Sequence, residues 1–239
     1  MIPKIIHYCW FGRKPLPASA CKCIASWRNY FPGYEIKEWN EDNFDVNIIP
    51  YTQQAYNARK YAFVSDYARF WILYHEGGLY FDTDVEVIKP FDDIVKNGAF
   101  MGLEIDGTKK GSKIAINPGL GLGAEANIPI YHEILMRFEK LCFYDSEKKR
   151  NNYSMIPMVT DLFLQMGLLS NGQVQHLCDV DIYPQRYFNP YDGVTGRLQL
   201  SPETHSIHWY SATWMDHYSL RFIISRLKKF LIRLLCMSN

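Results

Sequence analysis

The sequence has no cysteine pair spaced for a metal site, no long apolar run and almost no net charge. None of its six cysteines forms a Cys-x-x-Cys pair, so we expect free thiols in a reducing compartment. The 26 basic and 25 acidic residues nearly balance, so the net charge of the chain gives no reason to predict nucleic-acid binding. No run reaches the roughly 18 uncharged apolar residues that cross a bilayer, and the first residues do not form a signal-peptide pattern. We therefore predict a cytoplasmic protein.

What the sequence does contain is enough apolar material for a full core: 48% of its 239 residues are hydrophobic. We predict one domain over residues 1–215 and a tail over 216–239. Apolar runs that end in turn residues predict strands at 5–11, 34–39, 99–105 and 206–210, and longer runs predict helices at 19–30, 55–75 and 130–143. Strand, helix and strand at about 30-residue spacing are typical of a βαβ unit, so we predict an α/β fold with parallel strands.

Two carboxylates two residues apart, Asp82 and Asp84, follow the apolar run 77–81. In an extended chain, residues i and i+2 project to the same face, so both carboxylates address one oxygen-preferring cation. Such a cation can hold a diphosphate, which predicts an enzyme acting on a nucleotide-linked substrate.

A charged pair, Asp66 and Arg69, interrupts the apolar helix predicted at 55–75. At a spacing of three residues the two side chains share one helix face, and the apolar surroundings predict that the pair is held inside the protein. An Arg fork binds phosphate through two hydrogen bonds, so the pair suits a donor cradle. The alternative is a structural ion pair.

Three ordered motifs resemble one known family. The segments 2–7 with Trp10 and Gly12, 65–69, and 77–84 resemble the DXD-containing retaining glycosyltransferases of sequence family 32, which include yeast mannosyltransferases and bacterial capsule and lipopolysaccharide enzymes. The clostridial glucosylating toxins have a similar catalytic core. The resemblance implies a GT-A fold, with a Rossmann-like mixed sheet flanked by helices. It also implies a nucleotide-sugar-binding half at 1–90 and an acceptor-binding half with a closing flap at 91–215.

The resemblance also implies roles for single residues. Asp84 would bind the metal, Mn²⁺ or Mg²⁺, directly, and Asp82 would contact the metal region and the ribose. Asp66 would contact sugar hydroxyls, and Arg69 the sugar or diphosphate. The donor-binding set would further include Trp10, stacked on the nucleobase, and His7. For Trp10 the alternative is a core tryptophan, and for His7 it is a core histidine with satisfied hydrogen bonds.

A late segment, 205–214, resembles the closing segment of the same family. His208 would complete the metal site, and Trp214 would close over the donor as part of a mobile flap that excludes water. Thr213 stands where the family commonly has Ser. The alternative is that His208 packs in the core and that Ser211 or Thr213 supplies the ligand.

Polar residues after the predicted strand at 99–105 are candidate acceptor contacts, namely Glu104, Asp106 and Asn117. Solvated strand ends are the alternative for the two carboxylates. The glycine-rich segment 117–123 has neither the Lys-Ser/Thr pair of a P-loop nor the GxGxxG order, so it does not predict a phosphate loop. We expect it to form a flexible wall near the acceptor.

The tail alternates basic and apolar residues over 220–235, the pattern of a basic amphipathic helix. Such a helix lies in an anionic membrane interface, which would place the protein on the inner face of the membrane, or it docks on the catalytic domain with a solvated basic face. The pattern leaves both open.

Together these features predict a metal-dependent retaining glycosyltransferase. It would transfer a hexose, with galactose as first choice, from a UDP-sugar to a glycan or glycolipid hydroxyl in surface polysaccharide biosynthesis. A GDP-mannose-dependent mannosyltransferase is the alternative donor choice. Two further alternatives belong to other classes of protein. One is a DxD Mg²⁺-dependent phosphohydrolase, whose motif normally has Thr or Val where this chain has Glu86, and the other is a non-catalytic sugar-binding module.

Overall fold

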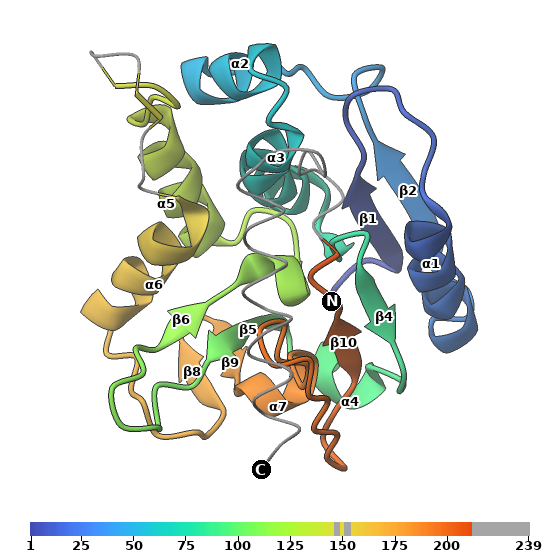
Figure 1. Cartoon of the computed structure of the whole chain (residues 1–239), viewed down its shortest axis with the longest axis vertical. Helices are drawn as coiled ribbons and strands as arrows, with labels where there is room; N and C mark the ends of the chain where they lie inside the picture. The colour runs from blue at the N-terminus through green and yellow to red at the C-terminus, as the bar shows by residue number, and fades with distance from the viewer. Residues whose placement is uncertain (146–148, 151–153, 212–239) are drawn as a thin grey trace.

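A computed structural model of the chain shows an α/β fold, in which helices pack on a sheet of mixed parallel and antiparallel strands (Figure 1). The structure describes residues 1–145, 149–150 and 154–211. Within these residues the main sheet has the strand order β2-β1-β3-β7-β5-β9-β8, and β6 pairs with β5. The strands of this sheet are β1 (Ile5–Cys9), β2 (Glu35–Trp39), β3 (Gly78–Tyr80), β5 (Ala99–Ile105), β6 (Ala115–Ile116), β7 (Leu122–Ala124), β8 (Gln175–Leu177) and β9 (Val180–Tyr183).

The first three strands form the parallel unit that the βαβ spacing predicts. β1 pairs in parallel with β2 on one side and β3 on the other. Gly78 permits this close packing, because its φ is +100° and a Cβ there would lie 2.8 Å from the Ile5 carbonyl oxygen. The carboxyl ends of the three strands meet at one edge, where open α/β sheets bind ligands.

The rest of the sheet is not parallel. β7 runs antiparallel to both β3 and β5, whereas β9 runs parallel to β5. The prediction of an α/β architecture with a mixed sheet and flanking helices is confirmed, but the expectation of parallel strands holds only in part.

Two of the helices differ from the prediction. The predicted helix at 55–75 is two helices, because the chain turns at Arg59, whose φ is +56°. The last predicted helix, at 130–143, ends at Glu139. The helices are α1 (Ala18–Tyr30), α2 (Pro50–Asn57), α3 (Tyr61–Glu76), α4 (Asp92–Val95), α5 (Pro129–Glu139), α6 (Met155–Gln165), α7 (Gln185–Phe188) and the 3-10 helix η1 (Pro118–Leu120).

A second, two-stranded sheet joins distant parts of the chain. β4 (Val85–Val87) pairs antiparallel with β10 (Ser206–His208), with His208 opposite Val85. Trp27 of α1 fixes β4 from the other side, because its indole N–H donates to the Val85 carbonyl at 2.8 Å. The late segment is thereby held beside the residues that follow β3.

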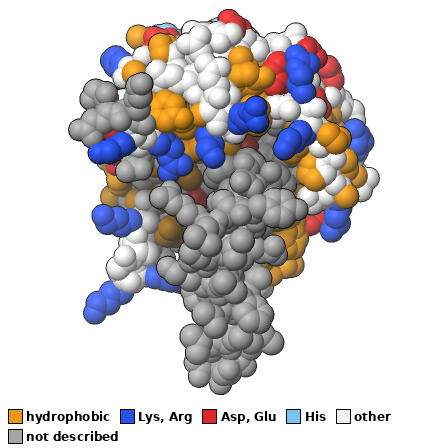
Figure 2. Space-filling model, turned by 45° about the horizontal axis from the view of Figure 1, so that its top comes forward, with side chains coloured by type: hydrophobic (Ala, Val, Ile, Leu, Met, Phe, Trp, Pro, Cys, Tyr) orange, Lys and Arg blue, Asp and Glu red, His pale blue; other side chains and the backbone are white. Residues whose placement is uncertain are grey.

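No helix within the described residues is long and apolar enough to cross a membrane. Lys and Arg side chains are distributed across the visible face in Figure 2, with hydrophobic side chains between them. The predicted helix at 220–235 and the tail at 216–239 lie outside the described residues.

Candidate active site

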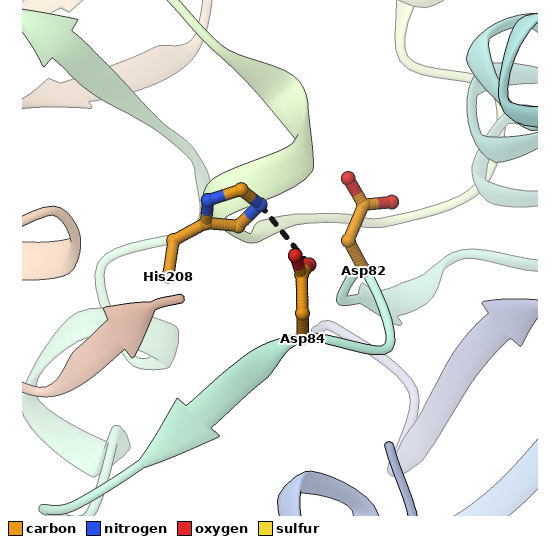
Figure 3. A group of neighbouring side chains, drawn as sticks. All are labelled: Asp82, Asp84 and His208. Carbon is orange, nitrogen blue, oxygen red and sulfur yellow. Dashed lines mark ion pairs between the residues drawn. The ribbon is translucent and has the colours of Figure 1, made fainter. Parts of the chain in front are cut away.

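The two DXD carboxylates lie in a turn rather than in an extended strand. β3 ends at Tyr80, and the backbone N–H of Val85 donates to the Asp82 carbonyl at 3.0 Å, which closes the turn before β4. The predicted extended geometry of the i, i+2 pair is therefore wrong. The two carboxylates still point toward the same side, because the turn directs them there (Figure 3).

His208 completes a group with Asp82 and Asp84. One ligand atom from each residue can be chosen so that all three lie within 4.8 Å of one another. His208 Nε2 is 3.2 Å from Asp84 Oδ1, and the backbone N–H and hydroxyl of Ser211 donate to Asp84 Oδ2 at 2.8 and 3.1 Å. The late segment thus reaches the DXD turn, and Ser211 bonds to a carboxylate of the group.

The charged groups at this site shift one another's pKa values. Although burial opposes the shift, His208 lowers the pKa of Asp84 to about 2. Against the effect of burial, the Asp84 carboxylate raises the pKa of His208 above its ordinary value. Burial also raises the pKa of Asp82, and Arg69 opposes that shift.

These residues fit a divalent cation. Two carboxylates and one imidazole are oxygen and nitrogen donors of the kind that Mn²⁺ accepts, and the imidazole favours Mn²⁺ over Mg²⁺. The side chain of His208 is 8% exposed, and its Nδ1 has no hydrogen-bond partner among the described residues. The nitrogen that faces the carboxylates is Nε2, 3.2 Å from Asp84 Oδ1, so a cation would use Nε2 together with oxygens of Asp82 and Asp84.

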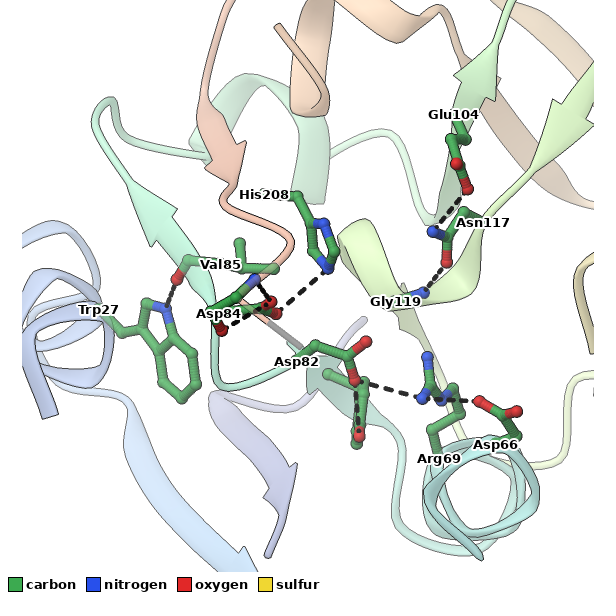
Figure 4. Close-up of polar contacts among 12 residues, drawn as sticks. Trp27, Asp66, Arg69, Asp82, Asp84, Val85, Glu104, Asn117, Gly119 and His208 are labelled. Atoms are coloured by element: carbon green, nitrogen blue, oxygen red, sulfur yellow. Dashed lines mark hydrogen bonds and ion pairs between the residues drawn. The ribbon is translucent and has the colours of Figure 1, made fainter. Parts of the chain in front are cut away.

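Arg69 lies at the centre of a second polar cluster, shown in Figure 4. Its guanidinium is 3% exposed, and Nη2 lies 3.1 Å from Asp66 Oδ1 and 3.2 Å from Asp82 Oδ1. Tyr80 donates its hydroxyl to Asp82 Oδ1 at 3.1 Å and places its ring under the guanidinium. Burial raises the pKa of Asp66 to about 7, against the opposing effect of Arg69. Of the pair predicted to lie inside the protein, Arg69 is buried and Asp66 is 16% exposed, and Arg69 joins the pair to the DXD turn.

One nitrogen of this cluster remains available. Arg69 Nη1 is buried and has no partner in the described part of the chain. Gly119 permits the close approach of Asp82 and Arg69, because a Cβ there would overlap Asp82 Oδ2 and lie 3.1 Å from Nη1. A buried cationic nitrogen without a partner fits an anionic or oxygen-rich ligand.

The two aromatic residues predicted to bind the donor have different surroundings. Trp10 follows β1 at the carboxyl edge of the sheet, is partly exposed and donates its indole N–H to the Lys14 carbonyl at 2.6 Å. His7 is fully buried. Its Nδ1 accepts from Trp39 at 3.0 Å and its Nε2 is 2.9 Å from the Gly77 carbonyl, so both ring nitrogens are in use. His7 occupies the position of a core histidine, as in its alternative interpretation.

The three predicted acceptor residues are all bonded within the protein. Asn117 donates to Glu104 Oε2 at 2.9 Å and accepts from the Gly119 N–H at 2.8 Å, and Asp106 accepts from the Gln185 N–H at 2.6 Å. Segment 117–123 is buried and contains η1 and β7, so the expectation of a flexible wall is wrong. Residues Thr213 and Trp214 lie outside the described residues.

Sequence reasoning missed Tyr80 and Gly119. Tyr80 was included only in an apolar run, and no local pattern marks its hydroxyl as a donor to Asp82. Gly119 lies in a glycine-rich segment whose spacing excluded a phosphate loop. Its importance comes from a tertiary contact with α3 and the DXD turn.

Part of the chain is similar to known glycosyltransferases. Residues 17–101 match the family described as glycosyltransferase sugar-binding region containing DXD motif. Inositol phosphoceramide mannosyltransferase 1 of Schizosaccharomyces pombe is 28% identical over 111 residues, covering 42% of this chain and 33% of the relative. A glycosyltransferase of Acanthamoeba polyphaga mimivirus is 33% identical over 106 residues, covering 42% of each chain.

The chain spans less than half the length of these two curated relatives. The solved structure of the PaToxG glycosyltransferase shares 18% identity with a TM-score of 0.49, covering 70% of this chain and 72% of that chain. The predicted relationship to DXD-containing glycosyltransferases is confirmed. The matched region contains Asp66, Arg69, Asp82 and Asp84.

Proposed function

We propose that this chain, whose residues 17–101 match a glycosyltransferase sugar-binding region with a DXD motif, is a metal-dependent retaining glycosyltransferase. It transfers a hexose from a nucleotide diphosphate sugar to a hydroxyl of a glycan or glycolipid in surface polysaccharide biosynthesis. The observation that carries the proposal is the convergence of Asp82, Asp84 and His208 within 4.8 Å, next to the buried Arg69.

The chemistry follows from charge. Breaking the bond between sugar and diphosphate builds negative charge on the leaving group, and a bound divalent ion would neutralise it. Neighbouring residues hold the two DXD carboxylates in place: Ser211 bonds to Asp84, and Tyr80 and Arg69 contact Asp82. Arg69 would direct its unpartnered Nη1 toward the donor. No carboxylate is identified as a nucleophile, so catalysis rests on leaving-group stabilisation and on positioning.

The donor is proposed to be a UDP-hexose, with galactose as first choice. A specific observation favours a second candidate, GDP-mannose, because the similar protein from Schizosaccharomyces pombe is a mannosyltransferase. Stacking on Trp10 suits uracil and guanine alike, so the base is decided by direct assay.

The acceptor is proposed to be a glycan carried on a lipid. The name of the fission yeast relative includes a phosphoceramide, which is a lipid, and this supports a lipid-linked acceptor. The basic amphipathic pattern at 220–235 would hold the enzyme on the inner face of the membrane, in the cytoplasm, near such an acceptor.

The test is sugar release from UDP-galactose, UDP-glucose, UDP-N-acetylglucosamine and GDP-mannose with Mn²⁺ or with chelator. We expect Mn²⁺-dependent turnover of one donor by the wild type and loss of both turnover and Mn²⁺-dependent donor binding in Asp84→Asn. Asp45→Asn is the matched control, because the exposed Asp45 carboxylate only caps a surface turn.

Two outcomes would contradict the proposal. Cleavage of phosphate esters without use of any nucleotide sugar would support the phosphohydrolase alternative. Glycan binding that is unchanged in Asp84→Asn, without turnover of any donor, would support a non-catalytic sugar-binding module.

A further inference from the structure

Glu104 lies outside the group of Asp82, Asp84 and His208, which is called the metal group below. Two sets of contacts connect it to that group. It stands near the end of β5, and its Oε2 accepts a hydrogen bond from Asn117 Nδ2 at 2.9 Å (Figure 4). Burial raises the pKa of the Tyr210 hydroxyl, and the charge of the Glu104 carboxylate raises it further. Glu104 therefore bonds to segment 117–119 and acts electrostatically on segment 208–211, and both segments reach the group of Asp82, Asp84 and His208.

The first set of contacts runs through Asn117 to Asp82. Asn117 is 7% exposed, and both ends of its amide are bonded, one to Glu104 and the other to the Gly119 N–H at 2.8 Å. The Gly119 carbonyl accepts from the backbone N–H of Asp82, and the Gly119 Cα faces Asp82 Oδ2. The Asn117 amide thus fixes the position of Gly119, and Gly119 in turn contacts Asp82.

The second set of contacts runs through Tyr210 to His208. The two rings meet edge to face, with centroids 4.2 Å apart and an interplanar angle of 80°. The φ of Tyr210 is +50°, a left-handed conformation that is uncommon for a tyrosine and persists only where its surroundings hold it. The electrostatic coupling between the Tyr210 hydroxyl and Glu104 would contribute to such a hold for the ring that packs on the imidazole.

We propose that Glu104 is a positioning residue that sets the spacing between Asp82 and His208 through Asn117 and Tyr210. This rests on the proposed function only in requiring that the Asp82–Asp84–His208 group binds a divalent cation. Residues that orient metal ligands typically change metal affinity by about 10–100-fold when they are removed. Glu104 would act by holding two ligands in register and would not itself contact the cation.

The experiment measures Mn²⁺ binding to the full chain by calorimetry and by the paramagnetic resonance spectrum of the bound ion. We expect Glu104→Ala and Asn117→Ala each to weaken Mn²⁺ binding by about 10-fold or more and to broaden the spectrum. Glu104→Gln keeps an oxygen that accepts from Asn117, so its affinity should stay within about threefold of the wild type.

Two further variants sharpen the test. The double variant Glu104→Ala/Asn117→Ala should lose little more affinity than either single variant, because residues acting through one contact are not additive. Glu133→Gln is the control, since Glu133 forms an exposed pair with Arg137 on α5. It should bind Mn²⁺ as the wild type does. Urea unfolding checks each fold, and Asn117→Ala carries the test should Glu104→Ala not fold.

Wild-type affinity and spectrum in Glu104→Ala would overturn the positioning role and leave the proposed transferase intact. A loss in Glu104→Gln as large as that in Glu104→Ala would also overturn it, because charge rather than position would then be responsible. Failure of the wild type to bind Mn²⁺ would contradict the metal group itself, and this proposal with it.

Discussion

Two buried histidines, His7 and His208, lie in regions that differ in what surrounds the ring. His7 is fully buried with both nitrogens bonded to Trp39 and Gly77, and burial lowers its pKa to about 4. His208 is nearly as buried, but one nitrogen faces Asp84, the other has no partner among the described residues, and its pKa is raised. Burial alone therefore does not distinguish the two histidines, whereas the Asp84 carboxylate beside the His208 ring does.

The largest expected difference between the two regions is in metal binding. His208→Gln should weaken Mn²⁺ binding by roughly 1,000-fold, more than the 10–100-fold typical of residues one step from a metal. His7→Gln should bind Mn²⁺ as the wild type does, because its ring faces the core. Titration calorimetry measures both, and equal losses in the two variants would remove the distinction drawn here.

The bonded, buried ring of His7 should make the stability of the protein depend on pH. The pKa of His7 is lowered from 6.5 to about 4 in the folded state, so the unfolded chain binds the proton more tightly. The neutral His7 ring therefore contributes to the free energy of unfolding. This contribution is fully present above pH 6.5 and is lost as pH falls toward 4, by about 3 kcal/mol in all.

Urea unfolding at a series of pH values measures this effect in wild type and His7→Gln. The difference in unfolding free energy between the two proteins should shrink as pH falls from 6.5 to 4. A difference that is constant over this range would show that His7 titrates alike in both states.

A glycine in each region allows the same substitution to be compared. A Cβ at Gly119 would displace Asp82 Oδ2, so Gly119→Ala should lower kcat/KM by about 10–30-fold with a small change in stability. A Cβ at Gly78 would lie 2.9 Å from His7 Nε2, and the residue has a positive φ, so Gly78→Ala should instead reduce stability. Donor turnover and urea midpoints together test this. Similar profiles in the two variants would contradict the comparison.

The smallest expected effect lies at the exposed margin of the His7 region. Lys37 pairs with Glu76 at 2.8 Å and stacks over Trp39 at 4.3 Å, and the pair is about one-third exposed. Lys37→Met should lower the unfolding free energy by about 0.5–1 kcal/mol and leave Mn²⁺ binding unchanged. Thermal unfolding with and without added salt checks the value, and a change in Mn²⁺ affinity would argue against the separation of the regions.

Local patterns predicted the elements that depend on local signals. The helix over 18–30 and the strands at β1, β2 and β5 appear where turn residues and apolar runs place them. The pattern missed the break between α2 and α3, because neither Gly nor Pro marks it and the chain turns at Arg59 within the mostly polar stretch 57–60. The antiparallel position of β7 could not be predicted either, since it depends on pairing with distant strands.

The site was predictable as a set of residue types but not as a geometry. Asp66, Arg69, Asp82 and Asp84 were chosen by spacing and resemblance, and the structure brings them together. The Asn117–Glu104 hydrogen bond and the Tyr210 ring against His208 were not, because they join segments far apart in sequence. Such contacts leave no local pattern.

The pairing of β4 with β10 has a consequence for synthesis of the protein. Ser211 bonds to Asp84 across 127 positions of sequence, and His208 arrives on the same late strand. A nascent chain that has emerged only through residue 200 carries the DXD turn without His208 and Ser211. Because closing so long a loop is slow, the group of Asp82, Asp84 and His208 would be completed only near the end of folding.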